Sequence, residues 1–100
     1  MADSLPGQYG LSIGYQQMTS LSSATAPTVP AGSLYALVQA EAVDCRWRDD
    51  GTAPSGTVGM LLSAGAPQGF TGGQLSTVQF IQTSGGTAKI NIEYYGAWHI

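Results

Sequence analysis

Charged side chains are scarce in this sequence, which has three basic and six acidic residues in 100 and a formal net charge of −3. A typical globular chain of this length carries about 25 charged residues. The cations are Arg46, Arg48 and Lys89, too few to neutralise several phosphates, so we expect no nucleic-acid partner. Low charge also weakens repulsion between copies and is typical of interface centres. The alternative is a monomer that uses uncharged polar groups for its surface, but we expect a homo-oligomer, a dimer or a trimer.

Cysteine and histidine are almost absent. Cys45 is the single cysteine, so an internal disulfide and a cysteine zinc cluster are both excluded, and its place in an apolar-alternating run predicts a core residue. His99 is the single histidine and stands next to the last residue. Because a chain end rarely orients an imidazole with a partner, we interpret His99 as an exposed terminal side chain. No cofactor and no metal are expected.

Long apolar runs and nucleotide or hydrolase motifs are also missing. No basic segment followed by an apolar stretch opens the chain, and no run is long enough to span a bilayer, so we expect synthesis in the cytoplasm and no membrane partner. No serine lies in a Gly-x-Ser-x-Gly elbow, and no glycine-rich stretch forms a GxxxxGK[ST] loop. These absences predict a protein that is not an enzyme.

Strand patterns punctuated by turn residues fill most of the chain, whereas the 3.6-residue apolar period of a helix is nearly absent. The predicted fold class is all-β: a small antiparallel β-sandwich or jelly roll with six to eight short strands and an extended N-terminal arm. One hundred residues form one domain. Within it we expect an arm and loop over 1–33, with one possible strand, and a sandwich body over 34–100.

The strongest strand signals are two alternating runs. Apolar residues recur at every second position over 34–40 and over 88–94, and shorter signals lie at 11–19, 43–48, 57–62 and 75–82. In 11–19 we expect Ile13 and Tyr15 on one face. Gly72-Gly73 is predicted as a turn. The residues expected to form the core are Val38, Trp47, Phe80, Ile90 and Ile92.

A second feature is the run Arg46, Trp47, Arg48, Asp49, Asp50, Gly51 and Thr52. An Asp-Gly pair between strand-like segments predicts a tight turn, in which an aspartate accepts bonds from following backbone N–H groups. Arg46 or Arg48 is expected to brace the turn through a carboxylate. Two carboxylates can also contribute to a calcium site, but neither a DxDxDG loop nor a distal acidic cluster accompanies them. The motif is therefore interpreted as structural.

Aromatic side chains gather near the C-terminus at Tyr94, Tyr95 and Trp98. Aromatics on a β surface can stack on sugars, which makes a receptor- or glycan-binding module one alternative. The other is a core tyrosine, a surface tyrosine and a tryptophan packed on a neighbouring chain. As candidate interface residues we name Tyr9, Leu11, Tyr95 and Trp98.

The second half of the chain resembles a known family. The matching stretches are Arg46-Trp47-Arg48-Asp49-Asp50-Gly51-Thr52-Ala53-Pro54, Val58-Gly59-Met60, Leu75-Ser76-Thr77-Val78-Gln79-Phe80-Ile81 and Ala88-Lys89-Ile90-Asn91-Ile92-Glu93-Tyr94-Tyr95. They resemble small proteins of tailed bacteriophages and prophages, which are typified by an R-x-R-D-D-G-T-x-P segment, an F-I strand and a closing strand ending in Tyr-Tyr.

That resemblance implies a non-enzymatic structural β-sandwich protein of the virion, made in the host bacterial cytoplasm. A capsid decoration (cement) protein is the first expectation, with the major capsid protein or other virion proteins as partners. A tail, baseplate or head–tail connector component is the alternative within the particle. Under the resemblance, Arg48 and Asp50 pin the loop while Trp47 packs beneath it.

Overall fold

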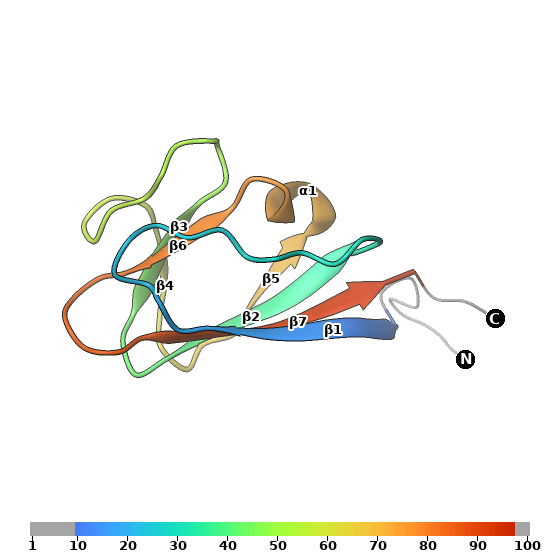
Figure 1. Ribbon diagram of the computed structural model, residues 1–100, viewed down its shortest axis with the longest axis horizontal. Helices are drawn as coiled ribbons and strands as arrows, with labels where there is room; N and C mark the ends of the chain where they lie inside the picture. The colour runs from blue at the N-terminus through green and yellow to red at the C-terminus, as the bar shows by residue number, and fades with distance from the viewer. Residues whose placement is uncertain (1–9, 98–100) are drawn as a thin grey trace.

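The computed structural model describes residues 10–97, and these form two antiparallel β-sheets with one short helix between strands (Figure 1). The prediction of an all-β sandwich is confirmed, with seven strands within the predicted range. The elements are β1 (Leu11–Met18), β2 (Tyr35–Glu41), β3 (Cys45–Arg48), β4 (Met60–Leu62), β5 (Gln68–Thr71), α1 (Gly72–Leu75), β6 (Gln79–Gln82) and β7 (Lys89–Gly96).

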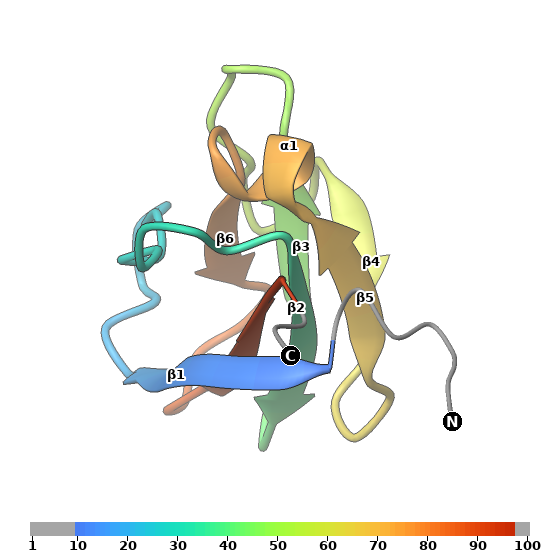
Figure 2. The ribbon, with the colours of Figure 1, turned by 90° about the vertical axis from the view of Figure 1, so that its right-hand side faces the viewer.

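The two sheets have the strand orders β1-β7-β2-β5 and β4-β3-β6. In the four-stranded sheet, β7 lies between β1 and β2, so the last strand of the chain joins the first two. Figure 2 shows β1 and β5 as the two opposite edges of this sheet. In the three-stranded sheet, β3 is central, and the edge of β6 is covered by a bridge between Thr25 and Phe80. The opposite edge strand, β4, has no such bridge along Met60–Leu62, and the nearest isolated bridge joins Ala64, just beyond its end, to Ala40 of β2.

The core lies between the sheets because the alternating strands turn one face inward. Aromatic contacts link the two sheets. The centroid of the Phe70 ring in β5 lies 4.8 Å from that of Trp47 in β3 and 5.8 Å from that of Phe80 in β6, and both contacts are edge-to-face. All five residues expected to form the core are buried, and so is Cys45. The buried set is Met18, Leu21, Ala36, Val38, Ala40, Cys45, Trp47, Leu62, Phe70, Leu75, Val78, Phe80, Ala88, Ile90, Ile92 and Tyr94.

The alternating run at 34–40 and the shorter signal at 43–48 form strands in different sheets. β2 ends at Glu41, and Ala42 has a positive φ of 74°, after which the chain enters β3. Ala36, Val38 and Ala40 are buried as predicted. Leu34, which was expected on the same face, is 43% exposed because it precedes β2 and lies beyond the core.

The first strand contains a β-bulge that the sequence pattern did not indicate. The register of β1 against β7 shifts between Ser12 and Gly14, so Ile13 is the extra residue. Ile13 packs against the core, whereas Tyr15 points to solvent opposite Glu93. The expectation that Ile13 and Tyr15 share a face is therefore wrong, because a bulge reverses the facing of all residues after it.

The turn predicted at Gly72-Gly73 is instead the start of α1. Thr71 caps this helix: its side chain accepts from the backbone N–H of Gln74, and the Gln74 side chain accepts from the Thr71 N–H at 2.9 Å. Leu75, expected at the start of a strand, is the buried residue of α1, and β6 begins only at Gln79.

Candidate functional site

The motif identified in the sequence lies at the end of β3 and in the segment that follows. β3 turns Cys45 and Trp47 into the core and leaves Arg46 and Arg48 half-exposed. The chain bends at 50–52, where Gly51 has a φ of 87°, but the bend does not lead directly into a strand, because residues 49–59 form one broad loop before β4 begins. The loop closes on itself through backbone bonds between Ser55 and Val58.

Arg48 and Asp50 brace the start of this loop as expected. The guanidinium donates through Nε to Oδ1 at 3.1 Å and through Nη2 to Oδ2 at 2.5 Å, and the Thr52 N–H donates to Oδ1 at 3.3 Å. The hydrogen bond with Arg48 lowers the pKa of Asp50, and the same bond raises the pKa of Arg48. Both side chains reach solvent, so this pair fixes local geometry more than it stabilises the fold.

Arg46 holds the far end of the loop, but through backbone carbonyls and not through a carboxylate. Its Nη1 donates to the Gly59 carbonyl at 2.9 Å and its Nε to the Gly56 carbonyl at 3.3 Å. Gly59 has a φ of 138°, and a Cβ there would lie 3.1 Å from the Trp47 carbonyl oxygen. The loop therefore returns so close to β3 that only glycine fits.

Asp49 connects the loop to the helix. Its carbonyl accepts from the Thr77 hydroxyl at 2.6 Å, and its carboxylate accepts from the Gln74 amide at 3.2 Å. Within residues 10–97 no three acidic, histidine or cysteine side chains gather where they could hold a metal ion. Asp49 and Asp50 instead take separate partners, which supports the structural interpretation of the motif.

Trp47 lies beneath the loop, as the resemblance implied, and it lines a surface hollow of about 410 Å³. Its indole Nε1 is buried without a hydrogen-bond partner, alone among the side-chain polar atoms of the described residues. The other residues lining the hollow are Arg48, Asp49, Asp50, Val58, Gly59 and Met60. The hollow is thus apolar at its floor and charged at its rim.

Next to this hollow, three large apolar side chains are exposed: Val58 by 53%, Met60 by 60% and Leu61 by 50%. We call these three residues the β4 patch. Met60 pairs with Trp47 in the β3–β4 register and so belongs to the inward face, yet the sandwich does not cover it. Met60 and Leu61 lie on opposite faces of β4. Because exposed apolar groups on both faces of an edge strand suit the addition of a partner strand, the β4 patch is the first candidate site.

Sequence reasoning identified the segment 57–62 as a strand but did not predict that it lies at an edge. The only signal was the absence of charge from Thr57 to Leu62. Exposure depends on which strand pairs on each side, and this is a property of the sheet order.

The predicted interface residues lie elsewhere. Leu11 is 41% exposed at the start of β1, and Tyr95 is half-buried on β7, where its ring lies 6.2 Å from the ring of Tyr35. Leu11 and Tyr95 therefore both lie in the four-stranded sheet, whereas the strand of the β4 patch belongs to the three-stranded sheet. Tyr9, Trp98 and His99 lie outside the described residues.

In the described part of the chain, no helix has the length and apolar character needed to cross a membrane. Compared with protein-family models, curated proteins and solved structures, the chain has no significant match. The resemblance to bacteriophage proteins therefore stays a prediction.

Proposed function

We propose that this chain is a non-enzymatic structural component of a tailed-bacteriophage particle, and specifically a capsid decoration protein that binds across subunits of the head shell. The observation that carries the proposal is the β4 patch, an exposed apolar surface beside an uncovered strand edge. The segments that resemble phage proteins include the motif, the loop and β7, and so they include part of this patch.

The edge of β4 is suited to binding an extended segment of a partner. An added strand would pair with the backbone of β4, while its side chains cover Met60 and Leu61 on the two faces. Fully burying an apolar side chain of this size contributes about 1.5–3 kcal/mol. A contact of this kind is modest for one copy, but many copies on one shell would add to its stability.

The first experiment is quantitative mass spectrometry of purified virions, normalised to the major capsid protein. A ratio of copies close to that of the major capsid protein is expected for shell decoration. A few copies, or about a dozen, would place the protein in the tail, baseplate or connector instead. Absence from the particle would reject the virion proposal and favour a receptor- or glycan-binding module.

A second experiment tests the surface. The double variant Met60→Gln, Leu61→Thr should fold with an unchanged circular dichroism spectrum but should not be retained on particles that lack the wild-type protein. The matched control is Leu37→Thr, which removes a leucine that is 41% exposed on the other sheet and should bind the particle normally. Normal retention of the double variant would exclude the β4 patch as the contact.

A further inference from the structure

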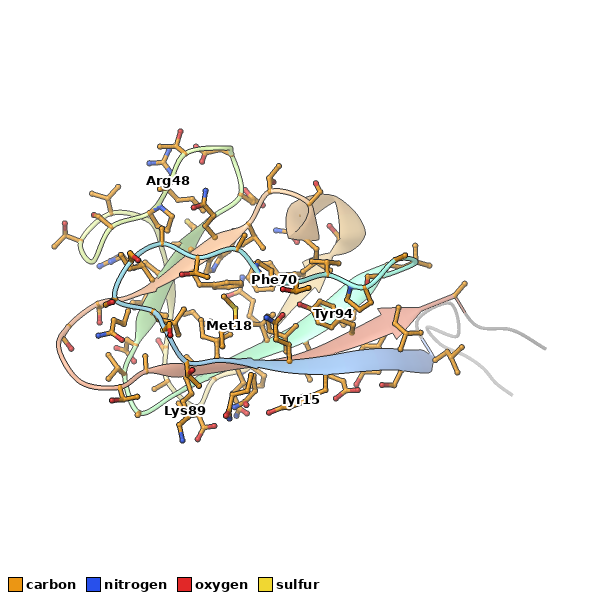
Figure 3. The ribbon with its side chains drawn as sticks, in the orientation of Figure 1. Tyr15, Met18, Arg48, Phe70, Lys89 and Tyr94 are labelled. Carbon is orange, nitrogen blue, oxygen red and sulfur yellow. The ribbon has the colours of Figure 1, made fainter. Side chains whose placement is uncertain are left out.

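The four-stranded sheet has a solvent-facing side of its own, which we call the outer face. Figure 3 shows Tyr15 and Lys89 pointing away from the core on this side, whereas Met18, Phe70 and Tyr94 point between the sheets. The outer face consists of Ser12, Tyr15 and Gln17 of β1, Lys89, Asn91, Glu93 and Tyr95 of β7, Tyr35, Leu37, Gln39 and Glu41 of β2, and Gly69 and Thr71 of β5. Three of these side chains are tyrosines, a residue type that is enriched in protein-binding surfaces.

Hydrogen bonds hold the centre of the outer face in one arrangement. The Asn91 carbonyl oxygen accepts from the Tyr15 hydroxyl at 2.5 Å and from the Gln17 amide at 2.9 Å, and the Asn91 amide donates to Glu41 at 2.7 Å. One asparagine thus connects β1, β7 and β2. Because these side chains are already ordered, less conformational entropy is lost when a partner covers them.

At the aromatic end of the outer face, Gly69 leaves room for the Tyr35 ring. A Cβ on Gly69 would lie 2.0 Å from the Tyr35 hydroxyl, so the Tyr35 side chain extends across β5 at this position. On its other side Tyr35 contacts the Tyr95 ring. Beside these residues, Leu37 is 41% exposed and Tyr15 is 59% exposed, and both line a shallow hollow of about 240 Å³.

The outer face carries three charged side chains: Glu41 of β2, and Lys89 and Glu93 of β7, of which the two on β7 have a self-complementary arrangement. Lys89 and Glu93 lie two residues before and two residues after Asn91, on the same side of the strand. Neither forms an ion pair within residues 10–97, where the pair Arg48–Asp50 is the one present. A two-fold axis that crosses β7 at Asn91, parallel to the sheet, would place Lys89 of each copy over Glu93 of the other.

We propose that the outer face binds a second copy of this chain, giving a two-fold dimer in which four-stranded sheets stack face to face and two Lys89–Glu93 pairs form between copies. Strands of eight, eight, seven and four residues give an outer face of about 440 Å², or about 880 Å² for two copies. This is close to the roughly 1,000 Å² of the smallest specific interfaces. The dimer is therefore weak, with dissociation in the micromolar range.

The same arrangement explains why the contact is isologous. In a two-fold interface every contact occurs twice: Lys89 of the first copy lies over Glu93 of the second, and Lys89 of the second lies over Glu93 of the first. One lysine and one glutamate per copy therefore make two ion pairs. The Tyr15 ring, which is 59% exposed in one copy, then lies against β1 of the other copy. The β4 patch belongs to the other sheet and stays free in this dimer.

The test is sedimentation equilibrium of the purified full-length chain over micromolar concentrations. Wild type should fit a monomer–dimer equilibrium. Lys89→Glu and Glu93→Lys should each weaken the dimer at least tenfold, because like charges then face each other. The double variant Lys89→Glu, Glu93→Lys restores opposite charges across the two-fold axis and should recover dimerisation. Leu61→Thr on the other sheet is the matched control and should leave it unchanged.

Each outcome is decisive for this dimer and independent of whether the protein is found in a virion. A monomer at all concentrations, a trimer, or single charge variants that dimerise like wild type would overturn the proposal. Failure of the double variant to recover, with its unfolding temperature equal to that of wild type, would also overturn it. If Glu93→Lys unfolds because it loses the bond from Ser12, Leu37→Asp takes its place as the disrupting variant.

Discussion

At the scale of single residues, Ala42 occupies the position where the chain passes from one sheet to the other. It is the one non-glycine residue with a positive φ between residues 10 and 97, at 74°, and its side chain is exposed. A left-handed conformation strains a residue that has a Cβ, by roughly 1–2 kcal/mol. The corner is therefore stabilised by the two sheets that it joins and not by its own conformational preference.

Replacing Ala42 with glycine should stabilise the protein. Relief of the strain outweighs the greater entropy of glycine in the unfolded chain, so we expect a gain of about 0.5–1 kcal/mol and a melting temperature about 4 °C higher. Differential scanning calorimetry measures the change. Ala42→Val is the control and should destabilise, because a β-branched residue is more strained at this φ. A lower melting temperature for Ala42→Gly would contradict this account of the corner.

Two buried ionisable groups predict how stability depends on pH. Burial, together with the nearby charge of Asp44, raises the pKa of the Cys45 thiol from 9.0 to about 11. Burial raises the pKa of Tyr94 from 10.0 to about 12. Both groups therefore stay protonated in the folded protein at pH values where the unfolded chain releases the protons. Stability should fall as pH rises, from 9 to 11 through Cys45 and from 10 to 12 through Tyr94.

Urea unfolding at a series of pH values between 7 and 11 measures this dependence. The contribution of these two groups to the free energy of unfolding should not change with pH below about 8.5. Above pH 9 the free energy of unfolding should decrease. Cys45→Ala should be less stable at neutral pH, since it leaves a cavity, but should lose the part of the slope that begins near pH 9. An unchanged slope in Cys45→Ala would exclude the thiol as its cause.

Single-residue features were predictable where one physical cause decided them. Cys45 and Trp47 are apolar positions in an alternating run, and both are buried. Asp50 precedes a glycine in a turn-forming segment, and its carboxylate accepts the bonds expected of it. Ala42 was not predicted, because its φ is imposed by sheets that meet at the corner and an alanine carries no turn signal.

At the scale of elements, the loop 49–59 depends on Arg46 more than on the ion pair that first suggested a turn. Arg46 donates two hydrogen bonds to loop carbonyls, whereas Arg48 binds one exposed carboxylate. Bonds from a charged donor to a partly buried carbonyl are stronger than an exposed ion pair.

We expect Arg46→Met to destabilise the protein by about 1–2 kcal/mol and to speed hydrogen exchange of the amides of Ser55 and Val58, which bond within the loop. Methionine keeps the apolar stem, so the difference reports the lost donors. Arg48→Met is the matched control and should have the smaller effect on both measurements. The opposite order would mean that the exposed pair organises the loop.

Elements with a long uninterrupted period were predictable, and those set by local backbone geometry were not. Both alternating runs are strands, since a strict period of two specifies one buried face. The bulge at Ile13 and the helix at Gly72–Leu75 were missed. A signal for the helix existed in Thr71 and Gln74, whose spacing is that of a capping box, but two glycines between them favoured a turn.

At the scale of the whole molecule, the candidate surfaces could not be predicted from sequence. Leu37, Met60 and Leu61 occur in runs that also contain core residues, and only the sheet order determines which of them face solvent. The low charge of the chain predicts a surface suited to contact with other proteins, and this stays a prediction. The sequence does not reveal which distant strands pair, and this long-range pairing determines whether a strand is central or at an edge.

That pairing gives the last prediction, because β7 is central to the larger sheet. It pairs along its length with β1 and with β2, and it contributes Ile90, Ile92 and Tyr94 to the core. A fragment of residues 1–86 therefore lacks the strand that joins its first two strands. We expect this fragment to show no cooperative urea transition by circular dichroism, whereas the full chain unfolds in one transition.

A synthetic peptide of residues 87–97 should restore the fold when it is added to the fragment, since it supplies both the missing backbone partners and the missing apolar face. The same peptide with Ile92→Asp is the control and should not restore it, because a charge would be buried between the sheets. A cooperative transition in the fragment alone would show that β1, β2 and β5 pair without β7. The fold would then be assembled from local contacts, and the order β1-β7-β2-β5 would not be what holds the ends of the chain together.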